Sequence, residues 1–145
     1  MPTYQRLLVA WLFVPVHRLL FRLSRGRLLG RLEGSGVLIL VTRGRRSGKP
    51  RSSPLIYFQF GESDDLIVVA SNYGQDHHPS WYLNAAADQN VTVELTGERF
   101  AARARIAGGD ERAALYERVV AANPRFARYR SAADREIPVV ALGRR

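Results

Sequence analysis

The sequence contains no cysteine, and this absence excludes several kinds of chemistry at once. A chain without thiols forms no disulfide, offers no thiolate nucleophile and holds neither a cysteine-bound zinc ion nor an iron–sulfur cluster. Its 145 residues, 46% apolar and 24% charged, are typical of one folded domain. We therefore expect any reaction to use oxygen or nitrogen groups or a bound cofactor.

Acidic residues are scarce in the first third of the chain. Residues 1–51 contain ten arginines and Lys49 against Glu33 as their one acid, whereas residues 52–145 are close to neutral. Arginine donates planar pairs of hydrogen bonds that suit phosphates and carboxylates. One interpretation of this charge is an anionic partner, and the other is a coding bias toward arginine.

Long apolar runs are absent as well. The run Leu7–Val16 has ten residues, about half of what a membrane-spanning helix needs. Basic, bulky residues follow it where a signal peptide would have small ones, so we expect a cytoplasmic protein. Over residues 12–23 apolar side chains recur at helical spacing, with Arg18, Arg22 and Arg25 on another face. This basic amphipathic helix either packs on the core or rests peripherally on an anionic membrane surface.

The remainder of the chain alternates short apolar runs with glycine-containing turns, which predicts strands joined by hairpins. Three connections are hairpin-short, which favours antiparallel pairing. We predict an α+β protein with a mostly antiparallel sheet of six strands. The expected strands are 37–42, 51–60, 66–71, 90–95, 99–107 and 137–142, with helices from 80 and over 110–122, and a polar turn over 123–130.

The loop from Gly44 to Arg51 places four cations and one serine within eight residues. Its glycines would let backbone N–H groups turn toward an anion, as in a phosphate-binding loop. It is not a Walker A motif, because three residues rather than four separate its glycines and Pro50 follows the lysine. Like charges at this density repel one another, which favours a bound anion over a solvated hairpin tip.

Two later segments carry polar and aromatic side chains. The acid and two histidines of residues 76–78 are consecutive, and neighbours in sequence rarely converge on one ion, so we expect no metal site. Trp81 and Tyr82 form either a wall over a planar ring or part of the core. Tyr129 offers a hydroxyl that could donate a proton to a substrate.

Together these segments resemble the deazaflavin-dependent nitroreductase family, small proteins of actinobacterial type that use coenzyme F420 on an FMN-binding-like split β-barrel. The resemblance covers about residues 30–142 in the family's order. It implies a single domain over 1–145, with a helix over 1–30 and a cofactor-binding split barrel over 31–145. The matching blocks are Leu40–Gly48 with Arg51 and Pro54-Leu55, Val68–Ser71, His78–Asn84, and Pro124–Tyr129 with Arg135–Val140.

The resemblance also implies an activity and a role for each block. A hydride would pass from reduced F420 to a small electron-poor acceptor such as a quinone or a nitroaromatic. Tyr129 and Ser71 would be the catalytic residues, with Tyr129 lining the acceptor pocket. The cofactor's phosphate and oligoglutamate tail would be held by Arg45, Arg46, Ser47, Gly48 and Arg51, and its ring by Val69, Ala70, Ser71, Asn72, Ser80, Trp81, Tyr82 and Asn84.

Three features depart from the family's pattern near the acceptor. Ile56 stands where the best-known members have tyrosine, Phe126 lacks a hydroxyl, and residues 72–74 replace a Lys-Gly-Gly type of turn. The identity of the acceptor therefore stays open, and the sequence does not determine the oligomeric state.

Alternative functions are an FMN-binding split-barrel oxidoreductase and a non-catalytic cofactor-binding or membrane-surface module. We expect no nucleic acid partner, because the cations cluster at one loop and one helix without a recognition motif.

Overall fold

The computed structural model describes residues 36–145, whose frame is one sheet of six strands. Every neighbouring pair in the order β2-β1-β4-β5-β6-β3 is antiparallel, which confirms the predicted α+β class. The amphipathic helix expected near the N-terminus lies outside the described residues. The strands are β1 (Gly36–Arg43), β2 (Pro50–Tyr57), β3 (Leu66–Val69), β4 (Asn90–Leu95), β5 (Glu98–Ile106) and β6 (Val139–Arg144).

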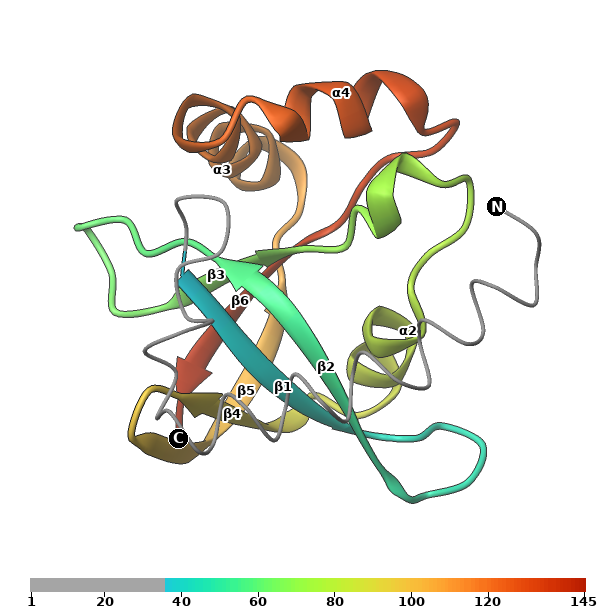
Figure 1. Cartoon of the computed structure of the whole chain (residues 1–145), viewed down its shortest axis with the longest axis vertical. Helices are drawn as coiled ribbons and strands as arrows, with labels where there is room; N and C mark the ends of the chain where they lie inside the picture. The colour runs from blue at the N-terminus through green and yellow to red at the C-terminus, as the bar shows by residue number, and fades with distance from the viewer. Residues whose placement is uncertain (1–35) are drawn as a thin grey trace.

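The sheet curls until its two edge strands meet (Figure 1). Just beyond β2, Phe58 forms an antiparallel bridge with Ile67 of β3, and each N–H donates to the other's carbonyl at 2.8 Å. No other bridge joins these two strands in the described part of the chain. The result is a barrel that is split along the seam between β2 and β3.

Apolar side chains fill the barrel and also cover part of its outer face. Inside lie Leu38, Leu40 and Val93, all fully buried, which alternate with outward-facing neighbours as pleated strands require. Strands β3 and β6 are apolar on both faces, because a second cluster packs on their outer side. Each such buried side chain contributes roughly 1.5–3 kcal/mol through removal from water.

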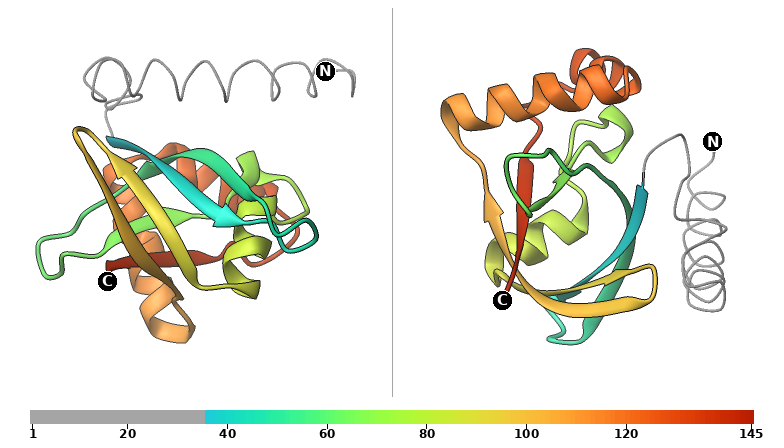
Figure 2. Two further views of the ribbon diagram at one scale, coloured as in Figure 1. Left: turned by 90° about the horizontal axis from the view of Figure 1, so that it is seen from below. Right: turned by 90° about the vertical axis from the view of Figure 1, so that its left-hand side faces the viewer.

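Within residues 36–145, three α-helices and one short 3₁₀ helix accompany the sheet (Figure 2). Helices α3 and α4 cover the outer cluster, and α2 packs against the barrel interior on a different side through Trp81 and Ala85. Their bounds are η2 (Asn72–Gly74), α2 (Ser80–Ala87), α3 (Gly109–Ala122) and α4 (Arg125–Ala132).

The prediction of a polar turn over residues 123–130 was wrong, because most of this segment is helix α4. Phe126 and Tyr129 are three residues apart and therefore share one helix face. That face packs on the outer cluster, where the Tyr116 hydroxyl donates to the Phe126 carbonyl at 2.8 Å. The segment has few apolar residues, so its helix is stabilised by tertiary contacts with the outer cluster rather than by its own composition.

Several strand limits also differ from prediction. The last strand starts at Val139 rather than at residue 137, because Pro138 has no N–H to donate to a ladder. Strand β3 ends at Val69, two residues before the predicted end, and this earlier end leaves residues 70–78 free to form the turn described below.

Candidate functional site

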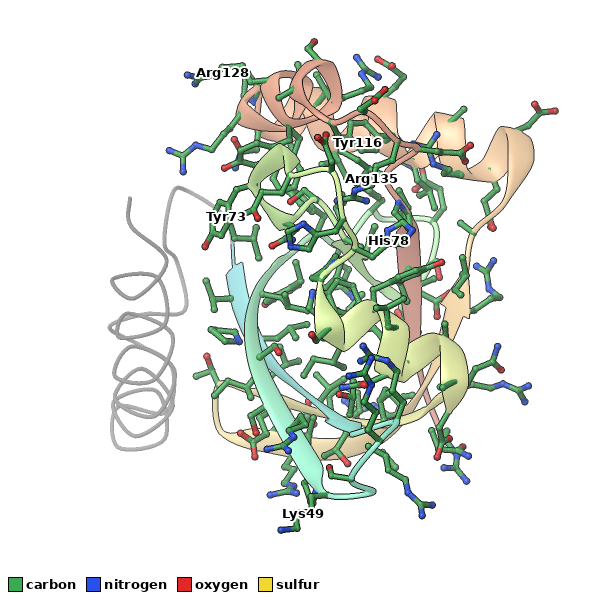
Figure 3. The ribbon with its side chains drawn as sticks, turned by 90° about the vertical axis from the view of Figure 1, so that its right-hand side faces the viewer. Lys49, Tyr73, His78, Tyr116, Arg128 and Arg135 are labelled. Atoms are coloured by element: carbon green, nitrogen blue, oxygen red, sulfur yellow. The ribbon has the colours of Figure 1, made fainter. Side chains whose placement is uncertain are left out.

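Two loops and helix α2 follow one another along one side of the barrel. Figure 3 shows Lys49 at one end of this side and Tyr73, His78 and Arg135 toward the other, with α2 between them. We name residues 43–51 the cationic hairpin and residues 70–78 the Arg135-held turn. The sequence-predicted site residues belong to these two loops, to α2 and its neighbouring strands, and to α4.

Several backbone N–H groups of the cationic hairpin form hydrogen bonds within the protein. The Gly44 N–H donates to the Lys49 carbonyl and the Gly48 N–H to the Gly44 carbonyl, both at 2.8 Å. The N–H groups of Arg45 and Lys49 donate to side-chain oxygens at 3.2 Å. The N–H groups of Gly44 and Gly48 are therefore used within the hairpin itself, and binding of an anion by this loop stays a prediction that rests mainly on its side chains.

The exposed side chains of the hairpin form a donor set for an anion. Arg46, Lys49 and Arg51 are exposed, and within residues 36–145 none of them forms a salt bridge. Arg51 makes one long contact, from Nη2 to Ser47 Oγ at 3.5 Å. Guanidinium and ammonium groups without acidic partners fit the phosphate and carboxylates of the F420 tail.

Arg45 has a different role from the other cations of the hairpin. Its Nη1 donates to Asn84 Oδ1 at 2.9 Å, and Asn84 Nδ2 in turn donates to Thr42 Oγ1 at 3.2 Å. Asn84 is buried, with 3% of its surface exposed. Both Arg45 and Asn84 were predicted to hold the cofactor, and the structure places them in a link between the hairpin and α2.

Helix α2 presents its residues unequally. Ser80 is exposed, whereas Trp81 lies in the barrel core with 6% of its surface exposed. Of the two interpretations of Trp81, the structure therefore places it in the core. Tyr82 is half-buried, and its ring lies 4.8 Å from the ring of His78, which brings α2 against the Arg135-held turn.

Arg135 holds the turn through four groups that lie far from it in the sequence. Its Nη2 donates to the Ala70 and Ser71 carbonyls at 3.1 and 3.0 Å, and its Nε to the Gln75 carbonyl at 2.9 Å. Its Nη1 lies 3.0 Å from His78 Nδ1. Since a guanidinium only donates, Nδ1 accepts and the His78 proton is on Nε2.

The electrostatics of this contact favour the neutral form of His78. Burial, and then the adjacent charge of Arg135, lower the pKa of His78 below its ordinary value. Burial also lowers the pKa of Arg135, although a guanidinium remains charged at any physiological pH. A neutral imidazole and a fixed cation therefore hold the two sides of the turn together.

Most of the residues after β3 that were predicted to contact the cofactor ring pack or form hydrogen bonds within the protein. Val69 packs toward α3 and α4, and Ala70 packs into the barrel. The Ala70 N–H donates to the Pro138 carbonyl at 2.9 Å, while its own carbonyl accepts from Arg135. Ser71 is 9% exposed and Asn72 is half-buried, so these two are the outermost of the predicted ring contacts after β3.

Helix α4 brings Tyr129 beside this turn. A Cβ built on Gly74 would lie 3.1 Å from the Tyr129 carbonyl oxygen, so glycine at a φ of +79° permits the approach. The Gly74 N–H donates to the Ser71 carbonyl at 2.8 Å. The two predicted catalytic residues, Tyr129 and Ser71, thus belong to elements in direct contact.

Sequence reasoning missed the function of Arg135. Its partners lie between 57 and 65 positions away, a separation that no local pattern reveals. The available signal was one arginine beside the apolar segment that leads into the last strand. Within residues 36–145, no group of three or more acids and histidines could hold a metal ion. No helix in that range is long and apolar enough to cross a membrane.

The chain resembles known proteins over most of its length. A family model described as F420H(2)-dependent quinone reductase matches residues 15–143. An F420H(2)-dependent quinone reductase of Mycobacterium tuberculosis is 33% identical over 134 residues, which are 90% of this chain and 89% of that protein.

Two solved structures are also similar to the chain. An F420-H2 dependent reductase, FDR-A, is 34% identical over 73% of this chain and 92% of its own, with a TM-score of 0.65. A structure described as a domain-swapped dimer is 30% identical over 92% of this chain and 98% of its own, with a TM-score of 0.68. The chain therefore belongs to the F420H(2)-dependent quinone reductase family.

Proposed function

We propose that the protein is an oxidoreductase that uses coenzyme F420 to reduce a quinone, with nitroaromatic compounds as further acceptors. The observation that carries this proposal is the cationic hairpin, whose exposed cations form no salt bridge within residues 36–145, in a chain of this family. An FMN-dependent reaction is the weaker candidate, because a single phosphate would leave most of these cations unused.

The chain's own residues would bind the two parts of the cofactor. Arg46, Lys49 and Arg51 would pair with the phosphate and carboxylates of the tail, assisted by the Ser47 hydroxyl. Residues Ser71, Asn72, Ser80 and Tyr82 would contact the ring. Arg45 and Asn84 would support the site without contacting the cofactor, because their hydrogen bond keeps the hairpin against α2.

The reaction needs one proton besides the hydride. Reduced F420, when bound, supplies a hydride, which carries two electrons. Conversion of a quinone to a hydroquinone then consumes one more proton, which the Tyr129 hydroxyl would donate before solvent restores it. Ser71 would orient the reacting groups, and Arg135 would keep the backbone on which Ser71 lies in place.

Quinone-dependent oxidation of F420H2 by the full chain tests this function. We expect one equivalent of 2-methyl-1,4-naphthoquinone to be reduced for each F420H2 oxidised. Reduced FMN in place of F420H2 serves as the matched control and should support much slower turnover. Binding of F420 without any quinone-dependent oxidation would contradict the proposal.

We also propose that the protein attaches reversibly to the cytoplasmic face of an anionic membrane. A lipid-soluble quinone favours an enzyme at the bilayer, and Arg18, Arg22 and Arg25 would each contribute about 1 kcal/mol near an anionic surface. Full-length protein should sediment with phosphatidylglycerol vesicles at low salt. Replacement of the three arginines by glutamine should abolish sedimentation, and indifference of the unaltered protein to these vesicles would contradict the proposal.

A further inference from the structure

Tyr73 combines two features that rarely occur together. Its side chain is 77% exposed, and its backbone has a φ of 57° and a ψ of 27°, in the left-handed region. A bulky residue adopts this conformation at a cost in free energy, and the cost is borne only where the surroundings enforce it. Burial of an apolar side chain, the usual compensation, is absent at Tyr73.

The surroundings fix the turn on both sides of Tyr73. Ahead of it, the Ser71 carbonyl accepts from the Gly74 N–H at 2.8 Å and from Arg135 at 3.0 Å. Behind it, the Gln75 carbonyl accepts from Arg135 at 2.9 Å. The strained backbone is therefore imposed by a hydrogen-bonded frame, and its effect is to present the Tyr73 ring outward.

The exposed ring lies beside the predicted proton donor. The centroids of Tyr73 and Tyr129 are 6.2 Å apart at an interplanar angle of 89°, and Tyr129 is itself backed by Phe126 at 5.3 Å. Two rings at right angles form a corner with one ring face and one ring edge. A flat, electron-poor ring placed in such a corner meets the geometry that aromatic contacts favour.

We infer that Tyr73 is a specificity-determining residue for the acceptor and favours fused-ring quinones over single-ring quinones. With Tyr129 it would form an aromatic corner against which the acceptor stacks, two residues along the chain from Ser71. A naphthoquinone offers a larger face to this corner than a benzoquinone does. The inference rests on the proposed function, since the acceptor would have to bind beside the cofactor ring.

Three substitutions separate the ring from the backbone strain. Tyr73→Phe keeps the ring, Tyr73→Asn removes it with a residue that tolerates the left-handed region, and Tyr73→Gly removes both ring and strain. We expect kcat/KM for 2-methyl-1,4-naphthoquinone to fall roughly 3- to 10-fold with Asn or Gly, mainly through KM, and to stay within about twofold with Phe.

Matched measurements distinguish this role from a structural one. Values for 1,4-benzoquinone and the Kd for F420 should change by less than about twofold, and the melting temperature of the Gly variant should not fall. Ile106→Ala, at a partly exposed apolar residue of β5, is the control and should change neither the quinone KM values nor the Kd for F420.

Each outcome leads to a definite conclusion. Naphthoquinone KM values within twofold of the unaltered protein in both the Asn and Gly variants would overturn the inference while the proposed function stands. An equal loss of F420 affinity would make Tyr73 a cofactor contact and would also overturn it. If the unaltered protein binds F420 but reduces neither quinone, the proposed function fails, and the assignment of Tyr73 fails with it.

Discussion

The cationic hairpin and the Arg135-held turn lie toward opposite ends of one side of the barrel, and they use positive charge in opposite ways (Figure 3). In the hairpin, Arg46, Lys49 and Arg51 are exposed and have no acidic partner within the described range. In the turn, the half-buried Arg135 is satisfied by three carbonyls and one imidazole. The hairpin leaves its charge exposed, as the proposed tail-binding site requires, and the turn uses its charge to hold the protein's own backbone.

This contrast leads to different expectations for mutations. Exposed cations act on an anion through interactions that salt screens, so several residues would share the binding energy and each loss would be modest. One guanidinium can donate to several carbonyls at once, so its removal leaves all of these carbonyls without donors. Mutations in the hairpin should affect binding of the cofactor, and mutations at the turn should affect stability and turnover.

The largest expected effect is on turnover, at the turn side of the molecule. Tyr129→Phe should lower kcat by roughly tenfold to 10⁴-fold, because the hydroxyl is the expected proton donor. The Kd for F420 should stay the same, because Tyr129 is not among the residues expected to contact the cofactor. Steady-state kinetics and fluorescence titration measure the two quantities. Tyr57→Phe loses a hydroxyl on β2 and is the control, and unchanged turnover with every accepted quinone would reduce Tyr129 to a packing residue.

The next effect sharpens the contrast at Arg135. Arg135→Gln should lower the free energy of unfolding by about 2–4 kcal/mol, because three carbonyls and His78 lose their donor. Arg112→Gln is the matched control, since Arg112 donates to one backbone carbonyl, that of Ile137, and pairs with the exposed Glu136. Urea denaturation measures both variants. The account of the turn fails if the two substitutions cost the same.

The hairpin should give the opposite result. Arg46→Ala or Arg51→Ala should each weaken F420 binding by about 1–3 kcal/mol, the usual cost of a lost charge-assisted contact, and leave stability unchanged. Arg103→Ala, at an exposed arginine of β5 that bonds Gln89, is the control. If neither hairpin variant alters the Kd in a fluorescence titration, the cationic hairpin is only a solvated turn.

The smallest expected effect concerns pH. Because burial and Arg135 lower the pKa of His78 in the folded protein, the unfolded chain binds a proton more readily. The contribution of His78 to stability is therefore present above its ordinary pKa near 6.5 and is lost as the pH falls below that value. Thermal unfolding between pH 5 and 7.5 should show a shallower slope for His78→Gln than for His77→Gln. Equal slopes would contradict the neutral state assigned to His78.

The sequence predicted the sheet well for a physical reason. Alternating apolar residues and short glycine turns determine strands and hairpins locally, so all six strands were expected within a few residues of their observed limits. Helix α4 was missed because three arginines dominate its sequence. Its two aromatic residues indicate a buried helix face only once the cluster on which they pack is known.

The residues of the candidate site could be predicted from the sequence, but the hydrogen bonds between them could not. The density of cations at residues 44–51 is visible in the sequence, but the use of the hairpin amides by its own backbone depends on the register of β1 and β2. Arg135 and Asn84 act through partners tens of residues away. Such contacts depend on how the barrel closes, which cannot be predicted from local sequence patterns.

Side-by-side titration of the full chain with F420 and with FMN, at low and at high salt, is the decisive test of the proposed cofactor site. We expect F420 to bind more tightly than FMN and high salt to weaken F420 binding, because several exposed cations would hold its tail. Tighter binding of FMN, or F420 binding that ignores salt, would contradict the function proposed for the cationic hairpin.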